Sequence, residues 1–212
     1  MSAVTAIDIL LEPDATMLEH ARADNARLLR AFPKGYALDA AHQPHISCLQ
    51  RYARTEALER IYAAVGNVLA GEHPATWKLT AYKYYYIPWK GLGLAGIVIR
   101  PTEELLRYQQ ALIDATAEFV VPTGTAAAYV TTPQDPDIVQ PLIEYVATFV
   151  PEHSGKNFSP HTTIGLAQTD YLDSMLAQKF AEFTFSPAGV SVYQLGNYGV
   201  AAKRLSNWTL SE

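Results

Sequence analysis

Two short stretches of the chain carry the same chemically useful pattern. Residues 43–49 read QPHISCL, and residues 159–167 read SPHTTIGLA. Each stretch places a histidine after a proline, and a hydroxyl residue two positions after the histidine. Near neutral pH an imidazole can serve as a base or as an acid, and a hydroxyl can donate a hydrogen bond to an anionic oxygen. Together the two stretches could transfer protons on both sides of one reacting group.

The spacing has a structural meaning on a β-strand, where side chains two positions apart point to the same face. His45 would then share a face with Ser47. His161 would share a face with Thr163, while Thr162 points the other way. One such tripeptide is weak evidence, because about one match is expected by chance in a chain of this composition. Two matches in the same structural setting are much stronger.

Such a pair of half-sites suits chemistry at phosphorus. One neutral imidazole takes a proton from water or a ribose hydroxyl, and the other, as imidazolium, protonates the departing oxygen. His45 and His161 are the acid–base pair of this hypothesis, and which of them is the acid stays open. Ser47 and Thr163 would donate to the phosphate oxygens where charge accumulates in the transition state.

The elements expected around the two stretches repeat in the order strand, helix, strand, strand. In the first half these elements are predicted over 44–52, 55–70, 77–87 and 92–99. In the second half they are predicted over 158–166, 170–182, 183–195 and 200–210, with a hairpin turn over 196–199. A strand over 4–11 and a helix over 17–32 precede both halves, and helices over 102–119, capped by Thr102, and 136–149 separate them.

The repeat predicts a single domain over 1–212 made of two lobes, with motif half-units of about 44–99 and 158–210 and a helical insert of about 102–149. The paired motifs and the repeated elements resemble those of the 2H phosphoesterase superfamily, which includes the bacterial 2′–5′ RNA ligase-like proteins and cyclic nucleotide phosphodiesterases. The resemblance implies an α+β fold of two pseudo-symmetric lobes around a central cleft, each an antiparallel sheet with flanking helices. It also implies a metal-independent phosphodiesterase that opens a 2′,3′-cyclic phosphate of a nucleotide or RNA end. The same residues would allow the reverse 2′–5′ ligation.

Six further residues are candidates for substrate binding. Arg51 lies four positions after Ser47, so simple alternation puts it on the Ser47 face, where it could contact phosphate. Aromatic side chains can stack on a nucleobase, although packing is expected for most tyrosines of the run YKYYYIPWKG at 82–91. The candidates are Arg51, Tyr84, Tyr86, Trp89, Lys156 and Phe158.

Composition narrows the classes of partner. With 21 acidic and 16 basic residues the chain has a net charge of −5, which argues against a surface for long nucleic acid but allows a small nucleotide or an RNA terminus. Cys48 is the only cysteine, and hydroxyls are poor zinc ligands, so we expect no disulfide, no metal and no cofactor. No apolar run approaches the ~20 residues that span a bilayer, and the N-terminus has no leader pattern. We therefore expect a cytoplasmic monomer without membrane contact.

Two other functions remain open from the sequence. One is a nucleotide-binding module that does not turn over its ligand. The other is a phosphoesterase for a non-nucleotide cyclic phosphate, with the insert over 102–149 as a lid.

Overall fold

The structure is a computed structural model that describes residues 3–39, 42–133 and 136–210. Its strands are β1 (Val4–Pro13), β2 (Ile46–Arg54), β3 (Leu79–Trp89), β4 (Leu92–Ile99), β5 (Val120–Val121), β6 (His161–Gln168), β7 (Phe183–Phe185), β8 (Pro187–Leu195) and β9 (Ala201–Thr209). The described strands form two antiparallel sheets, a five-stranded one in the order β5-β2-β1-β8-β9 and a four-stranded one in the order β6-β4-β3-β7.

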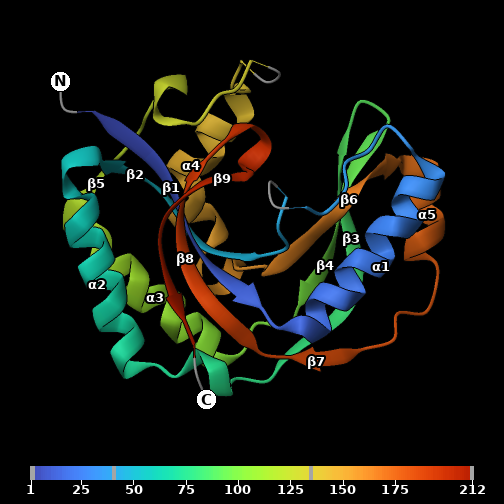
Figure 1. The fold of residues 1–212 in the computed structure, drawn as a ribbon, viewed down its shortest axis with the longest axis horizontal. Coiled ribbons are helices and arrows are strands. Elements are labelled where there is room, and N and C mark those ends of the chain that lie inside the picture. The colour runs from blue at the N-terminus through green and yellow to red at the C-terminus, as the bar shows by residue number, and fades with distance from the viewer. Residues whose placement is uncertain (1–2, 40–41, 134–135, 211–212) are drawn as a thin grey trace.

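Helices flank both sheets (Figure 1). They are α1 (Ala15–Ala31), α2 (Leu58–Gly71), α3 (Glu103–Thr116), α4 (Gln140–His153) and α5 (Thr169–Leu176). α1 and α5 pack on the four-stranded sheet, α3 and α4 pack on β2, and α2 packs on α3. The predicted α+β architecture of two antiparallel sheets with flanking helices is confirmed. Within the described part of the chain, no helix combines the length and apolar character needed to cross a bilayer.

The two sequence half-units do not coincide with the two sheets. β2 comes from the first half but pairs with β1, whereas β3 and β4 of the same half belong to the sheet that contains β6. The predicted hairpin of β8 and β9 forms, but in the sheet of β2. Each sheet is therefore built from both halves of the chain.

The prediction of one continuous strand over 183–195 is wrong. The chain forms β7 in the four-stranded sheet, changes direction at Ser186, and continues as β8 in the five-stranded sheet. Asp14 holds this crossing point: its backbone N–H donates to the Ser186 carbonyl at 2.9 Å, and its carboxylate accepts from the Ser186 N–H at 2.9 Å. The same side chain caps α1 by accepting from the N–H of Met17.

The helices differ from their predicted ranges mainly at their ends. Thr102 caps α3 as predicted, with its hydroxyl accepting from the N–H of Leu105 at 3.2 Å. α4 begins at Gln140 rather than at 136, with Pro141 in the first turn, where its missing donor costs nothing. α5 ends at Leu176 rather than at 182, and beyond it Phe180 packs edge-on against Tyr84 at 4.7 Å instead of continuing the helix.

β1 lies in the middle of the five-stranded sheet and is buried on both faces. Ile7, Ile9 and Leu11 belong to the main hydrophobic core, and Ala6 belongs to a smaller cluster beneath α4. Asp8 alternates onto the Ala6 face and is 0% exposed. A carboxylate in such a place is uncommon unless it has partners, and those partners lie in the candidate site.

Candidate active site

The two motif stretches meet where the sheets approach each other. β2 and β6 contact each other although they belong to different sheets. His45 immediately precedes β2, and His161 is the first residue of β6. Burial lowers the pKa of His161, a hydrogen bond to Ser159 opposes this, and the neighbouring charge of His45 lowers it further. The two imidazoles therefore lie within electrostatic reach of each other.

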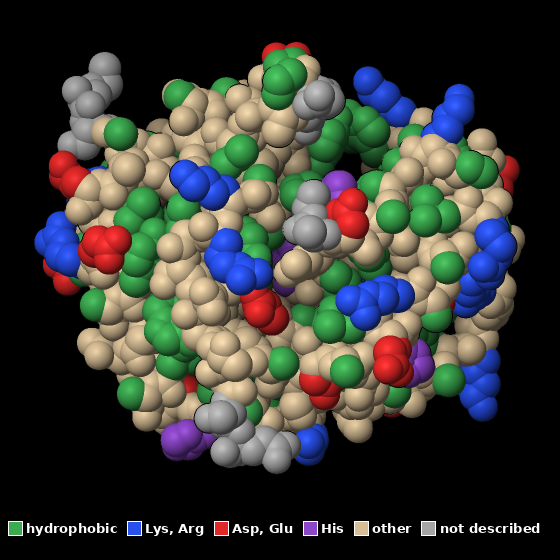
Figure 2. All heavy atoms as spheres, in the orientation of Figure 1, with side chains coloured by type: hydrophobic (Ala, Val, Ile, Leu, Met, Phe, Trp, Pro, Cys, Tyr) green, Lys and Arg blue, Asp and Glu red, His purple; other side chains and the backbone are tan. Residues whose placement is uncertain are grey.

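The molecular surface is hollowed between the parts built on the two sheets. Figure 2 shows purple histidine atoms inside this hollow, while Lys and Arg are scattered over the same face rather than gathered around it.

The predicted alternation of side chains holds through both motifs. Ile46 and Cys48 are 0% exposed, as are Thr162 and Ile164. The motif histidines and the hydroxyl residues Ser47 and Thr163 are partly exposed on the opposite faces. Thr163, not Thr162, is thus the hydroxyl that shares a face with His161.

Each motif histidine is held in the same way. The Nδ1 atom of His45 lies 2.8 Å from the carbonyl oxygen of Gln43, and that of His161 lies 2.9 Å from the carbonyl oxygen of Ser159. A carbonyl oxygen only accepts hydrogen bonds, so Nδ1 carries the hydrogen in both rings. In each ring Nε2 is then the nitrogen that can exchange a proton.

A β-bulge follows the hydroxyl residue in both motif strands. The extra residue is Cys48 in β2 and Ile164 in β6. A bulge bends the strand and reverses the alternation beyond it. The two half-sites therefore share four features: the residue types, the Nδ1 contact, the alternation and the bulge.

The bulge at Cys48 overturns the prediction for Arg51. Past the bulge, Gln50 rather than Arg51 lies on the Ser47 face, and its Nε2 donates to Asp8 Oδ2 at 3.0 Å. Arg51 points away and donates to the Ile113 carbonyl and the Thr116 hydroxyl, each at 2.9 Å. These bonds tie α3 to the sheet, so the guanidinium does not face the histidines. Burial lowers the pKa of the Arg51 guanidinium.

Asp8 joins the first half-site from the adjacent strand β1. The hydroxyl of Ser47 donates to its Oδ2 atom at 2.5 Å, and His45 Nε2 lies 4.0 Å from the same atom. Burial raises the pKa of Asp8 above its ordinary value, and the charge of His45 and the hydrogen bonds from Ser47 and Gln50 offset this only in part. Asp8 was not among the predicted site residues; its signal in the sequence is that of a single acidic residue inside the apolar run AIDILL at 6–11.

Tyr85 is the aromatic residue that the structure places beside a motif histidine. Its ring centroid lies 4.8 Å from that of His161, at an interplanar angle of 62°. Tyr85 is paired with Gly96 on β4, where a Cβ atom would overlap the tyrosine ring. Gly96 thus leaves the space through which the ring reaches His161. Tyr85 was not among the predicted site residues; the signal for it in the sequence is that, by alternation, it faces opposite to Tyr84 and Tyr86.

Three of the aromatic residues that were candidates for contact with the substrate lie away from the motif histidines. Tyr84 donates to Asp24 Oδ2 of α1 at 3.0 Å, and Tyr86 donates to Asp173 Oδ1 of α5 at 2.6 Å, so both hydroxyls point to the helix-covered face of β3. Phe158 is 7% exposed and packs in the main core. These placements correct the prediction that they face the substrate, because the helices and the core already use their side chains.

Trp89 and Lys156 are exposed, as their place in turns suggested. Trp89 is 48% exposed at the β3–β4 turn, with the Lys90 ammonium 5.4 Å from its ring centroid. Lys156 lies in the turn Gly155–Asn157 that precedes the second motif. Among the described residues, no contact joins either side chain to the motif histidines or hydroxyls.

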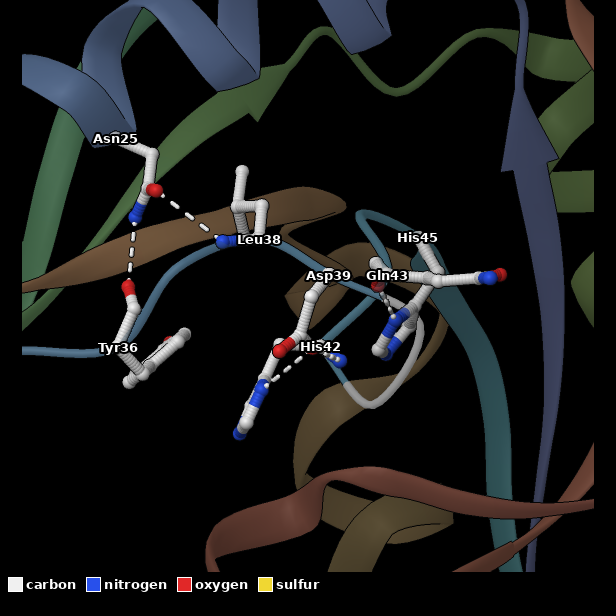
Figure 3. A network of polar contacts seen from close by, with 7 residues as sticks. All are labelled: Asn25, Tyr36, Leu38, Asp39, His42, Gln43 and His45. Carbon is white, nitrogen blue, oxygen red and sulfur yellow. Dashed lines mark hydrogen bonds and ion pairs between the residues drawn. The ribbon is translucent and has the colours of Figure 1, made fainter.

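Asn25 of α1 links the two half-sites and is 5% exposed. Its side chain accepts from Leu38 N at 3.1 Å and donates to the Tyr36 carbonyl at 3.0 Å, both in the loop that leads to His45 (Figure 3). It also donates to the carbonyl of the bulge residue Ile164 at 2.9 Å. Gly165 follows with φ +143°, and a Cβ there would lie 2.8 Å from the Asn25 amide nitrogen. One buried amide thus positions the approaches to both motifs.

No family model matches the sequence, and no curated protein sequence matches it significantly. Solved structures do match the fold. The protein TT0787 of Thermus thermophilus is 18% identical, with 97% of this chain and 98% of that chain covered and a TM-score of 0.57. E. coli LigT in complex with NADP+ is 14% identical, with 99% and 100% covered and a TM-score of 0.52.

These likenesses define the class of fold. The chain has the fold of the 2H phosphoesterases, two antiparallel sheets with flanking helices about a central hollow. TT0787 and LigT share it nearly end to end. The resemblance stated from the paired motifs is confirmed at the level of the fold.

Proposed function

We propose that this protein is a metal-independent phosphodiesterase that hydrolyses a 2′,3′-cyclic phosphate of a nucleotide or RNA end. The observation that carries the proposal is the duplicated geometry of His45 and His161. Both rings are held at Nδ1 by a carbonyl two residues earlier, and they lie within electrostatic reach where β2 and β6 meet. Two imidazoles that are held at Nδ1 can supply, through their Nε2 atoms, both proton transfers that the reaction needs.

The reaction follows from these groups. One Nε2 takes a proton from water, whose oxygen attacks phosphorus as the bond from phosphorus to one ribose oxygen breaks. The other Nε2 donates a proton to that departing oxygen. Thr163 and Ser47 donate hydrogen bonds to the non-bridging oxygens, where negative charge increases. With the 5′-hydroxyl of a second ribose in place of water, the same forward steps open the cyclic phosphate at the 3′ oxygen and join 2′–5′ ends; run in reverse, they cleave that link and restore the cyclic phosphate.

Two further observations support a nucleotide-sized substrate. LigT, which shares the fold, has been crystallised with NADP+, a phosphorylated dinucleotide. In this protein the ring of Tyr85 packs against the imidazole of His161, and a tyrosine ring offers a surface for a base or sugar. We propose a small nucleotide or an RNA terminus as the substrate, and a cytoplasmic monomer as the acting species.

The test is a product assay with 2′,3′-cyclic nucleotides, cyclic-phosphate-ended oligonucleotides and 1″,2″-cyclic sugar phosphates, with EDTA present. We expect hydrolysis of at least one nucleotide substrate, and a loss of about 10²-fold or more in His45→Ala and in His161→Ala. His73→Ala, at a position outside the two motifs, is the matched control and should keep the wild-type rate.

Three results would count against the proposal. Wild-type turnover in either motif variant would remove the two-histidine assignment. Turnover of the sugar phosphates alone would favour a non-nucleotide phosphoesterase. Binding of AMP-like ligands between pH 5 and 8 without any product would favour a nucleotide-binding module.

A further inference from the structure

The two half-sites have the same internal geometry, but the strands adjacent to them bring different side chains to the two histidines. β1 lies beside the first motif strand and brings Asp8 to 4.0 Å from His45 Nε2. β4 lies beside the second motif strand, and there the ring of Tyr85 packs against His161. Among the described residues, no carboxylate lies within ion-pair distance of His161. Within the described part of the chain, His45 is thus the motif histidine that has a carboxylate beside it, and His161 is not.

The carboxylate of Asp8 is arranged as an acceptor. Asp8 is 0% exposed, and both donors that reach it, Ser47 Oγ at 2.5 Å and Gln50 Nε2 at 3.0 Å, bind the same oxygen, Oδ2. The other oxygen, Oδ1, has no partner among the described residues. Two donors on one oxygen suit an ionised carboxylate, and that oxygen is also the one nearest to His45.

The other groups that face Asp8 do not balance its charge. Cys48 lies on β2, and burial raises the pKa of its thiol. Tyr145 on α4 is close enough to interact with Asp8, and burial raises its pKa to about 12. On β8, Tyr193 is paired with Asp8, and its hydroxyl accepts from Arg204 at 2.9 Å. His45 is the neighbour that can carry a positive charge near pH 7.

We propose that Asp8 is a positioning residue that makes the half-sites unequal, holding Ser47 and favouring the protonated form of His45. This inference rests on the proposed function. His45 is then the general acid, and His161, which packs against the ring of Tyr85, is the general base. In hydrolysis His161 Nε2 takes the proton of the attacking water, and His45 Nε2 gives its proton to the ribose oxygen that leaves phosphorus. Proton exchange with solvent restores both rings.

A consequence concerns the two hydroxyls. Ser47 donates its hydrogen to Asp8 in the resting site, whereas the hydroxyl of Thr163 has no hydrogen-bond partner among the described residues. Thr163 is therefore the hydroxyl ready to donate to phosphate, and Ser47 belongs to the Asp8–His45 group until substrate binds.

The test uses Asp8→Asn, which keeps the shape and removes the charge. In kcat measured from pH 5 to 9, we expect the alkaline limb, which reports the general acid, to move to lower pH by about 1 unit, because an opposite charge within reach favours the protonated form. The rate at pH 8 should fall about 10-fold, and the acid limb should stay in place. An unchanged alkaline limb, or a shift of the acid limb instead, overturns the proposal.

Asp24→Asn is the matched control. Asp24 is also buried, at 6% exposed, but its partners are Arg27 and Tyr84 on the helix-covered face. Its replacement should leave both limbs unchanged, so a shift that appears in both variants would count as a general effect of lost stability and against a role of Asp8. Asp8→Ser is a second charge-free variant, whose hydroxyl can still bind Ser47, for use if the asparagine variant does not fold.

A second readout separates this inference from the proposed function. NMR titration of the two imidazole rings needs no substrate, and in Asp8→Asn the midpoint of His45 should fall while that of His161 is retained. If the wild type hydrolyses no cyclic phosphate, the proposed function fails, yet the titration still decides the role of Asp8. Equal midpoints for His45 in wild type and variant would remove that role.

Discussion

Tyr85 lies edge-on against the imidazole of His161, with 4.8 Å between the ring centroids. The contact depends on a residue of the intervening strand, because Gly96 has no side chain where the tyrosine ring crosses β4. It covers the histidine that has no carboxylate beside it among the described residues, and burial lowers the pKa of that histidine. The aromatic ring is therefore the neighbour of one motif histidine, as Asp8 is the neighbour of the other.

Removal of the ring should change the acid side of the pH profile. A lowered pKa keeps His161 neutral to lower pH, so the acid limb of kcat/KM in the wild type should lie below ~6.5, the ordinary value for histidine. Tyr85→Ala exposes the imidazole to water, and the limb should move to higher pH. Tyr85→Phe keeps the ring and should keep the limb. Identical limbs in the alanine variant and the wild type would refute this role of the ring.

Gly96→Ala should displace the ring of Tyr85 from its position beside His161. The new methyl group would overlap the ring of Tyr85 and lie 2.9 Å from the carbonyl oxygen of Thr162, so the tyrosine must move. We expect kcat/KM to fall about 10-fold, because a small misplacement of catalytic groups is costly. The matched control is Gly71→Ala in α2, where the added Cβ meets nothing within 4 Å. Equal activity of the two variants would contradict the prediction.

Adjacent threonines of the second motif should behave in opposite ways. Thr163→Val removes a phosphate donor and should lower kcat by about 10²-fold. Thr162 is 0% exposed, and its hydroxyl has no partner among the described residues. Thr162→Val removes an unpaired buried oxygen, so kcat should be retained and the free energy of unfolding should stay the same or rise by about 1 kcal/mol. Urea unfolding and initial rates, measured on both variants, check this pair.

Asn25→Leu should weaken both half-sites at once. The amide makes three hydrogen bonds, to Leu38, Tyr36 and Ile164, and its loss leaves buried backbone groups unpaired. We expect the free energy of unfolding to fall by about 2–4 kcal/mol, and kcat/KM to fall in the protein that remains folded. Wild-type stability in chemical denaturation would show that water replaces the amide without cost.

Arg51→Met should affect stability and leave substrate binding intact. Its guanidinium bonds the Ile113 carbonyl and the Thr116 hydroxyl in α3, so we expect a loss of about 1–2 kcal/mol in the free energy of unfolding. KM should not change, because the side chain faces away from the histidines. A several-fold rise in KM with unchanged stability would instead support the phosphate contact of Arg51 that simple alternation predicts.

The motif pairs could be predicted because their geometry is local. Two residues on one strand share a face wherever that strand lies, so His161 and Thr163 could be paired before any fold was known. Arg51 could not be placed, because the extra residue Cys48 is defined by pairing with β1, a strand more than thirty positions earlier. Asp8 entered the site through the same long-range pairing.

The course of the strands was harder to predict than their existence. Ser186 and Pro187 interrupt the apolar pattern over 183–195, and a proline marks a possible break in a strand. The local sequence does not show, however, that Phe185 and Pro187 belong to different sheets. Phe158 was expected at the site because it is near the second motif in sequence, yet it packs in the core. Hydrophobic periodicity indicates which face of a strand is buried, but not which other strand it pairs with.

The crossing at Ser186, clamped by Asp14, has a consequence for how the protein folds. Because the chain passes repeatedly from one sheet to the other, neither sheet can form from one continuous segment of the chain. Fragments cut between the two motifs should remain unfolded when expressed separately, and the intact chain should lose both sheets in one cooperative transition. The distance between the two imidazoles is then a property of the global fold rather than of either half of the chain.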